Sequence, residues 1–563
     1  MTTNKNIADI FNNIGSMLEI LGDNPFKIRA YKKASSTIKI LDQDLAEISV
    51  NGQLTDIKGI GKDLAKKINE HITTGRIEYY EELKSRVPEE LLKIKNIQGI
   101  GPKLLQTLFN DFGVENISDL ENVLTNEEFI NKKGVGTKKI NELKVGIKLF
   151  KSHLNKINLG IALPAAEALC SELLKIPGIN KAEITGDILR GKETVESLEV
   201  LVSASDINQI TESLHNITLI ESNTINENDG LIEFTLGSGI PAYVHLTDEQ
   251  IFYTDKFITT GSIEHVNKIK DLYKQTGTEF TPNLFTSQEN IYKEINLEFI
   301  PSELREGNDE FELAKSGIPH LVRLEDIKGD LHTHSTWSDG KSTIEEMARS
   351  ATKLGYEYIA ITDHSVSSRI ANGLDIERLK EKKRELIEID DSFDGIKIIY
   401  GSEVDIKPDG TLDYADDILK DLDMVVASVH SSFKMNKKDM TRRITKALSN
   451  PYVCALGHPT GRLIGERNPY NLDIFEVIKT AKKYGKALEV NASYMRLDLK
   501  DEHIKMALEN GVKLIISTDA HHTDQLNQMR YGISTARRGV ASKNSIINTL
   551  PLSKLTEWLN EFK

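Results

Sequence analysis

The stretch Asp330–Gly340, with the sequence DLHTHSTWSDG, holds two histidines two residues apart and an aspartate five residues further on, namely His332, His334 and Asp339. The preceding run, Leu324–Leu331, has the apolar pattern of a strand. Residues two apart on a strand point to the same face. Imidazole and carboxylate groups that converge on one point are typical ligands of first-row metal ions. The stretch therefore predicts a metal site at the end of a strand.

From residue 325 onward, strand-like and helix-like segments alternate seven times. Helical stretches of roughly 10–15 residues separate most of the apolar runs, which predicts parallel strands joined by helices and a closed or nearly closed barrel. The predicted strands are Ile327–Thr333, Tyr358–Thr362, Lys397–Val404, Met424–Val429, Val453–Gly457, Ala487–Asn491 and Lys513–Thr518.

Potential metal ligands follow six of these seven strands. Because the carboxyl ends of parallel barrel strands form one rim, we expect these side chains to converge there. They are too many for one tetrahedral ion and suffice for two or three divalent ions, with Zn²⁺, Mn²⁺ or Fe²⁺ suitable. We interpret Asp363 as a partner that orients His364. The candidate ligands are His332, His334, Asp339, His364, Glu403, His430, His458, Asp519 and His521, of which Asp339, His364 and Asp519 are also candidate catalytic residues.

Motifs in this segment resemble the PHP (polymerase and histidinol phosphatase) superfamily. HTHSTWSDG, ITDHS, GSEVDI, VHSSF, GHPTGR, EVNASYMRLDL and STDAHH follow one another in the order of that superfamily. The resemblance implies a distorted (β/α)7 barrel and metal-dependent phosphoester hydrolysis. Basic residues near the motifs would then bind substrate phosphate, although a solvated surface position is the alternative for each. These residues are Lys341, Arg369, Arg462 and Arg496.

A short glycine motif occurs three times in residues 1–150. The copies read IKGIGKDLAKKI from residue 57, IQGIGPKLLQTL from residue 97 and KGVGTKKINEL from residue 133. Paired glycines permit a tight turn with positive φ, after which backbone N–H groups at a helix N-terminus suit a phosphate. One copy alone indicates a plain turn, whereas three copies resemble the helix-hairpin-helix module, which binds DNA backbone without reading sequence. The predicted DNA-binding positions are Gly59, Gly61, Gly99, Gly101, Gly134 and Gly136.

The segment between the repeats and the barrel changes to an α+β pattern. With helical repeats before it, it resembles the palm of the X family of DNA polymerases, through RGKET at 190–194, TGSIEH at 260–265 and PSELRE at 301–306. The whole chain resembles the bacterial family X DNA polymerase with a C-terminal PHP nuclease domain. The resemblance also aligns Lys67 with the Schiff-base lysine of the family's lyase domain.

The palm departs from the family pattern at its catalytic aspartates. Ser197, Glu199 and His245 stand at these three positions, and Asp187 stands where the turn would hold a triphosphate. Serine and neutral histidine are poor ligands for Mg²⁺, which prefers hard oxygen donors. We therefore expect no effective magnesium pair in the palm and little or no synthetic activity.

Composition is compatible with this reading. The chain has 39% hydrophobic and 28% charged residues and a net charge of −14. Residues 1–150 carry 22 Lys and Arg against 21 Asp and Glu, and the rest carries 49 against 64. The absence of a long apolar run or signal-peptide pattern predicts no membrane partner. Two distant cysteines, Cys170 and Cys454, predict reduced thiols, no disulfide partner and a cytoplasmic protein.

These observations predict a multidomain fold with N-terminal all-α helix-hairpin-helix domains, an α+β nucleotidyltransferase-like palm and a C-terminal distorted (β/α)7 PHP barrel. The expected domains are a lyase-like domain at 1–80, a fingers-like domain at 81–150, the palm at 151–253, a thumb-like domain at 254–318 and the PHP phosphoesterase domain at 319–563. The leading hypothesis is a DNA repair protein, a metal-dependent 3′–5′ exonuclease or 3′-end phosphoesterase acting on gapped, nicked or single-strand 3′ DNA ends. The alternatives are an active gap-filling polymerase with this nuclease, a small-molecule phosphatase, and a DNA-binding scaffold with structural metals.

Overall fold

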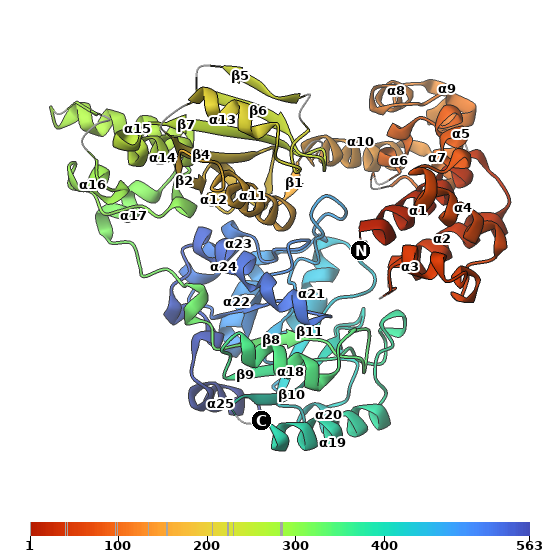
Figure 1. The fold of residues 1–563 in the computed structure, drawn as a ribbon. Helices are drawn as coiled ribbons and strands as arrows, with labels where there is room; N and C mark the ends of the chain where they lie inside the picture. The colour runs from red at the N-terminus through yellow and green to blue at the C-terminus, as the bar shows by residue number, and fades with distance from the viewer. Residues whose placement is uncertain are drawn as a thin grey trace. The chain divides into compact units, whose positions relative to one another are not determined.

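The computed structural model describes residues 2–39, 41, 43–95, 97, 99–132, 134–153, 156–204, 207–221, 224–228, 230–277, 279–281, 285–393 and 395–563. Contacts divide the chain into two compact units, Met1–Leu154 and Asn155–Lys563. The fold class predicted from the sequence is confirmed: helical repeats come first, an α+β palm follows, and a parallel barrel ends the chain (Figure 1). The finer division into five domains stays a prediction.

The first unit consists of α-helices in the part that the structure describes. Its core includes Phe11 and Tyr31, whose rings meet edge to face with centroids 5.5 Å apart. The apolar side of each short helix closes over this core, because none can bury its stripe alone. The helices are α1 (Thr2–Leu21), α2 (Pro25–Lys39), α3 (Leu45–Val50), α4 (Lys62–Thr74), α5 (Glu78–Arg86), α6 (Glu89–Ile94), α7 (Pro102–Phe112), α8 (Ile117–Val123), α9 (Glu127–Ile130) and α10 (Gly136–His153).

The palm is a five-stranded sheet in the order β2-β4-β7-β6-β5. Only the central pair β4–β7 is parallel, and the helix α11 (Leu159–Leu173) packs on β2 and β4. The α+β pattern predicted for this segment is confirmed. The strands are β2 (Ile179–Ile184), β4 (Leu198–Ala204), β5 (Asn226–Asn228), β6 (Leu231–Thr235) and β7 (Pro241–Thr247), with β1 (Ile157–Asn158) and β3 (Thr194–Val195) as a separate pair and α12 (Gly186–Leu189) and α13 (Ile207–Leu214) as further helices.

A small helical segment follows the palm. Its helices are α14 (Phe252–Thr260), α15 (Ile263–Gln275), α16 (Gln288–Lys293) and α17 (Glu310–Ser316). His265 is fully buried among them, with its Nδ1 2.8 Å from Glu310 Oε1 and its Nε2 2.9 Å from the Tyr292 hydroxyl. This buried polar group is therefore satisfied on both ring nitrogens, which fixes how the helices pack.

Seven parallel strands in sequential order form the C-terminal barrel. They are β8 (Gly329–Thr333), β9 (Tyr358–Ile361), β10 (Lys397–Asp405), β11 (Met424–Ser428), β12 (Ala455–Leu456), β13 (Ala487–Asn491) and β14 (Leu514–Ser517). All seven predicted strands are confirmed, with one correction at the first. Leu324–Asp326 is a 3-10 turn, and the strand begins only at Gly329.

The first and last strands approach each other at their carboxyl ends. The Asp519 N–H donates to the His332 carbonyl at 2.9 Å, and the His334 N–H donates to the Ala520 carbonyl at 2.8 Å. These bonds close the rim at the positions that carry potential ligands. The surrounding helices are α18 (Ile344–Lys353), α19 (Ile376–Ser392), α20 (Asp416–Leu419), α21 (Lys437–Leu448), α22 (Ile474–Tyr484), α23 (Asp501–Glu509), α24 (Met529–Arg538) and α25 (Leu552–Asn560).

Local signals start and stop these helices. Thr343 accepts the Glu346 N–H at the start of α18 while the Glu346 carboxylate accepts the Thr343 N–H, a reciprocal capping box. Gly485 ends α22 with φ of +68°, a conformation that glycine adopts without a Cβ penalty. Among the described residues, no helix is long and apolar enough to cross a membrane.

Candidate metal centre

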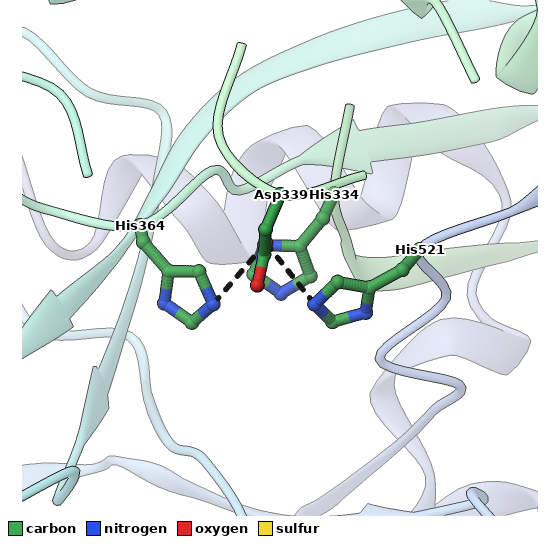
Figure 2. Close-up of side chains that lie close together, drawn as sticks. All are labelled: His334, Asp339, His364 and His521. Carbon is green, nitrogen blue, oxygen red and sulfur yellow. Dashed lines mark ion pairs between the residues drawn. The ribbon is translucent and has the colours of Figure 1, made fainter. Parts of the chain in front are cut away.

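Four side chains from three separate strand ends meet at the rim of the barrel. Figure 2 shows His334, Asp339, His364 and His521 converging, with Asp339 Oδ1 3.2 Å from His521 Nε2 and 3.6 Å from His364 Nε2. The His334 ring stacks between the other two, at centroid distances of 4.2 Å to His521 and 4.4 Å to His364. Each of these residues comes after a barrel strand, and the parallel strands end at the same rim, so the four side chains meet there.

Glu403 lies at the centre of the remaining histidines. Its Oε1 is 2.9 Å from His458 Nε2 and 3.2 Å from His430 Nε2. Its Oε2 is 2.9 Å from His364 Nδ1 and 3.5 Å from His332 Nε2. The carboxylate is thus shared among imidazoles from four strands, which suits a group that bridges cations.

Asp519 completes the arrangement from the other side. Its Oδ1 lies 3.1 Å from His334 Nε2 and 3.7 Å from His332 Nε2. All nine candidate ligands predicted from the sequence are therefore brought to one rim. In the described part of the chain, potential ligand atoms within 4.8 Å of one another form the groups His334–Asp339–His364–His521, His332–His334–Asp519 and His364–Glu403–His430.

The chemistry of these donors fits divalent metal ions. Several of their nitrogen and oxygen atoms are buried without a hydrogen-bond partner, which is rare for protein polar groups unless another ligand satisfies them. Soft thiolates are absent from the group, and mixed imidazole and carboxylate donors suit Zn²⁺, Mn²⁺ and Fe²⁺. The atoms without a hydrogen bond in the described structure are His332 Nε2, both ring nitrogens of His334, His364 Nδ1, Glu403 Oε2 and His458 Nδ1, although some of them lie in the ion-pair contacts given above.

The carboxylates and histidines shift one another's ionisation. Burial opposes charge on Glu403, but attraction to His430 and His332 outweighs it and holds the pKa of Glu403 well below its usual range. Burial likewise opposes charge on His430, but the neighbouring Glu403 and Asp405 raise its pKa to about 10. For His334, burial together with repulsion from His521 and other imidazoles lowers the pKa to about 3.

Two buried carboxylates orient ligands, and the sequence analysis missed both. Glu489 accepts a hydrogen bond from His332 Nδ1 at 2.7 Å, and Asp405 accepts one from His430 Nδ1 at 2.5 Å. Such partners set which imidazole nitrogen faces the metal. Each carboxylate lies inside a quoted motif, EVNASYMRLDL or GSEVDI, at a period-2 position on its strand, which was the available signal.

Asp363 has a different role from the one predicted. It forms an ion pair with the fully buried Lys382 at 2.9 Å and accepts hydrogen bonds from the Ser335 N–H and the Ser335 and Ser338 hydroxyls. The described structure contains no hydrogen bond between its side chain and His364. Asp363 therefore holds the loop between His334 and Asp339 instead of orienting His364.

A cavity of about 590 Å³ opens over the ligands. Arg369 and Arg496 line it, together with Ser367 and Ser368. The Arg496 Nε lies 3.5 Å from Asp519 Oδ2, and its Nη1 is buried without a hydrogen-bond partner. Two of the four residues predicted to bind substrate phosphate, Arg369 and Arg496, therefore line this cavity.

The other two predicted phosphate contacts lie elsewhere. Neither Lys341 nor Arg462 lines this cavity. The Arg462 side chain is nearly buried and donates to the carbonyls of Arg496 and Leu497 at 2.8 and 2.5 Å. It also pairs with Glu193 of the palm at 2.7 Å. Arg462 therefore serves an internal contact through its Nε and Nη2.

The glycine repeats adopt the predicted turns with a difference between the two glycines. The first glycines, Gly59, Gly99 and Gly134, have φ of +95°, +97° and +93°. Gly61 and Gly101 instead have φ of −84° and −93° and cap α4 and α7 without a side-chain hydrogen bond. A Cβ added at either position would meet nothing within 4 Å. Backbone strain therefore does not require glycine there, whereas close approach of a ligand would.

The third repeat differs slightly. Gly136 has φ of +62° at the start of α10, and Lys133, which opens this copy, lies outside the described residues. Lys67 lies on α4 with its Nζ 3.0 Å from both Asp63 oxygens and 5.4 Å from the centre of the Tyr79 ring. Its side chain is mostly covered, at 15% exposure, so it does not resemble an ordinary solvated lysine.

The palm positions come together without a set of carboxylates. Glu199 on β4 and His245 on the parallel neighbour β7 approach to 3.5 Å between Oε2 and Nε2. Ser197 lies on a bend directly before β4, the strand that carries Glu199. Asp187 pairs with Arg190. One carboxylate and one imidazole remain where a pair of magnesium ions would need several oxygens.

The cations of the nucleotide turn are also engaged. Glu306 lies 3.3 Å from Arg190 Nε and 2.8 Å from Lys192 Nζ. Glu306 is in turn 2.8 Å from Arg538 of the barrel. Burial disfavours its charge, but the bonds from Lys192 and Arg538 outweigh this and lower the pKa of Glu306. A triphosphate would compete with this ionised carboxylate.

Comparison with known proteins agrees with the architecture. Residues 2–77 match the family described as helix-hairpin-helix domain, and residues 330–493 match the family described as PHP domain. The chain is 34% identical to the DNA polymerase/3′-5′ exonuclease PolX of Bacillus subtilis (strain 168), over 99% of both chains. Shorter relatives named probable phosphatase, from Thermoanaerobacter sp. (strain X514) and Caldanaerobacter subterraneus subsp. tengcongensis, are 33% and 31% identical, over 42% and 41% of this chain and 95% and 91% of theirs.

Proposed function

Because the chain belongs to the PolX family, we propose that it is a DNA repair protein whose barrel is a metal-dependent 3′–5′ exonuclease or 3′-end phosphoesterase. The observation that carries this proposal is the convergence of nine imidazole and carboxylate side chains, several with unpartnered ligand atoms, beneath one cavity. The proposed substrates are gapped, nicked or single-strand 3′ DNA ends.

The protein's own groups have separate tasks in this reaction. The nine ligands would hold two or three divalent ions, with Mn²⁺, Zn²⁺ or Fe²⁺ suitable. Such ions, when bound, supply Lewis-acid polarisation of the phosphoryl oxygens and lower the pKa of water. Arg496 and Arg369 line the cavity and would hold phosphate oxygens of the substrate strand.

We further propose that nucleotide insertion by the palm is weak or absent. Glu199 is the only carboxylate at the three positions where the family has aspartates. Asp187 and Glu306 add negative charge around the nucleotide turn and already pair with its cations. The magnesium chemistry of polymerases therefore lacks both its ligands and a free phosphate site.

The helical unit would deliver the nuclease to DNA. The turns at Gly61 and Gly101 leave helix N-termini uncovered, and such termini bind phosphate through backbone N–H groups. This contact reads no sequence. Lys67 is the candidate lyase nucleophile of the same unit by its alignment with the family's Schiff-base lysine, and its ion pair with Asp63 would have to open before the amine attacks.

The test uses full-length protein, Mn²⁺ and a 5′-labelled primer strand in a gapped duplex, with and without dNTPs. We expect shortening of the labelled strand in both conditions. An Asp519→Ala protein serves as the control for contaminating nucleases. A labelled strand that stays full length with Mn²⁺, with Zn²⁺ and with Fe²⁺ would refute the proposal.

The same assay separates the second candidate, an active gap-filling polymerase, which the full-length similarity to a polymerase favours. Templated extension by the Asp519→Ala protein would support it. A small-molecule phosphatase, suggested by the shorter relatives, would instead release phosphate from histidinol phosphate and leave the DNA intact.

A further inference from the structure

The loop 493–498, which carries Arg496 toward the metal rim, is held from behind by residues of the palm. We propose that the palm acts as a positioning element of the nuclease and that Glu193 is the palm residue that sets Arg496 in place. This inference rests on the proposed nuclease function. It gives a role to a palm that lacks the catalytic aspartates of the family.

An unbroken set of contacts connects Glu193 to the cavity. Glu193 Oε2 lies 2.7 Å from Arg462 Nη2. The same guanidinium donates through Nε to the Arg496 carbonyl at 2.8 Å and through Nη2 to the Leu497 carbonyl at 2.5 Å. Arg496 then points its side chain at the rim, with Nε 3.5 Å from Asp519 Oδ2.

Arg462 needs Glu193 for a physical reason. Only 9% of the Arg462 side chain is exposed, and a buried cation without a partner is strongly unfavourable. Two neutral carbonyls satisfy its hydrogen bonds without balancing its charge. Glu193 supplies the negative charge that balances the guanidinium of Arg462, and it fixes which edge of that guanidinium faces the loop.

Further palm residues press on the same loop. Gly160 at the start of α11 lies so close to Tyr494 that a Cβ there would be 2.1 Å from the ring. Asn158 Nδ2 lies 3.6 Å from Met495 Sδ. Leu497 is fully buried in the hydrophobic cluster of the palm, although it belongs to the barrel sequence.

The loop backbone is strained where the palm contacts it. Leu497 has φ of +42°, a left-handed conformation that is strained for a branched side chain and persists only where its surroundings enforce it. The surroundings here are the palm cluster and the Arg462 bond to the Leu497 carbonyl. Without the palm contacts, the loop would relax to a less strained backbone conformation, and Arg496 would move with it.

The test compares two palm glutamates that each pair with a barrel arginine. Glu193 pairs with Arg462, and Glu167 pairs with Arg530 at 2.9 Å. The two carboxylates are similarly exposed, at 40% and 48%, but their arginines reach the Arg496 loop differently. Arg462 donates to two backbone carbonyls of the loop, whereas Arg530 reaches it through Tyr531, whose ring packs against Tyr494. Glu193→Gln and Glu167→Gln in the full chain therefore remove equal charge from the same interface.

The readout is Mn²⁺-dependent hydrolysis of bis-p-nitrophenyl phosphate and of a 5′-labelled single strand, with Mn²⁺ stoichiometry and Tm measured alongside. We expect Glu193→Gln to lower kcat/KM about tenfold on both substrates, since displacement of a phosphate-binding group is costly, with unchanged stoichiometry. Glu167→Gln should stay within about twofold of wild type. In an Arg496→Ala background, Glu193→Gln should have no further effect, because the group it positions is gone.

Two results would overturn the inference. One is an equal loss in Glu193→Gln and Glu167→Gln, which would mean that only docking of the palm matters. The other is the same tenfold loss from Glu193→Gln in the presence and absence of the Arg496 side chain. An inactive wild-type protein would instead contradict the proposed nuclease function, so the two failures are distinguishable.

Discussion

His332 and Glu489 form a hydrogen bond of 2.7 Å between two side chains that are fully buried. Glu489 Oε2 also accepts a hydrogen bond from the His458 backbone N–H, so one carboxylate holds both the His332 ring and the backbone of His458 in place. We expect Glu489→Gln to weaken metal binding about 10–100-fold, the usual effect of losing a carboxylate behind a ligating histidine. Competition with a chromogenic chelator measures this affinity. Glu557→Gln on the exposed face of α25 is the matched control, and equal affinities of the two variants would contradict the role.

Removal of a ligand should stop the chemistry and spare DNA binding. Asp519→Ala removes the carboxylate beside His332 and His334, and His334→Ala removes one of these two rings. We expect at least a 10³-fold loss of nuclease rate in either variant through lost stabilisation of transition-state charge. Fluorescence anisotropy on gapped duplex should give a Kd close to that of wild type. Full nuclease activity in both variants would show that the rim is not the active centre.

Metal binding should become tighter as the pH rises. Burial disfavours charge on His430 and His521, but carboxylates outweigh it and raise their pKa to about 10 and about 9 in the metal-free protein. Both imidazoles are therefore protonated at pH 7, and an ion must displace those protons. The apparent affinity should increase by up to about tenfold per pH unit for each displaced proton between pH 6 and pH 8.

Calorimetry in buffers of different ionisation enthalpy counts the released protons. Asp405→Asn serves as a comparison, because the Asp405 hydrogen bond contributes to the raised pKa of His430. Its removal should flatten the pH dependence. An affinity that is the same at pH 6 and pH 8 in the wild type would refute this prediction.

Substitution of the second glycine in a repeat should affect DNA binding more than folding. Gly101 has φ of −93°, and a Cβ there meets no atom within 4 Å, so Gly101→Val is compatible with the free protein. A valine side chain would block close approach of a phosphate to the α7 N-terminus. We expect at least a fivefold weaker Kd on gapped duplex, a smaller dependence of Kd on salt, and an unchanged Tm.

Gly99→Val is the contrasting variant. Gly99 has φ of +97°, and a Cβ would lie 3.2 Å from Glu142 Cγ, so this change should lower the Tm as well. Unaltered DNA affinity in Gly101→Val at two salt concentrations would argue against phosphate binding at this turn.

Primer extension tests the palm once the nuclease is silenced. The Asp519→Ala protein should show no templated insertion across a gap, because Glu199 and His245 offer one carboxylate for two ions. A triple change to Asp at Ser197, Glu199 and His245 should recover some insertion if only the ligands were lost. Robust extension by the Asp519→Ala protein itself would show that the palm is an active polymerase.

The order of the barrel strands and the nine residues at the rim follow from patterns in the amino-acid sequence. Both depend on local regularities: side chains alternate along a strand, and a ligand that follows a parallel strand lies at its carboxyl end. The glycine turns are equally local, because φ is a property of one residue. The boundary of the first strand was misplaced because the apolar Leu324 lies on a 3-10 turn that the apolar pattern resembles.

The partners of the long polar side chains depend on the folded arrangement and could not be predicted from local patterns. His332 and Glu489, which form a hydrogen bond, are 157 residues apart in the sequence. Asp363 forms an ion pair with Lys382 instead of the predicted contact with His364. Arg462 turned away from the cavity to Glu193, 269 positions earlier by residue number. Each choice depends on burial and on the position of a distant opposite charge, because a buried ion must be paired wherever the fold supplies a partner. Periodicity can mark the strand face of a residue such as Glu489, but it does not tell which distant side chain that residue pairs with, so packing determines the pairing.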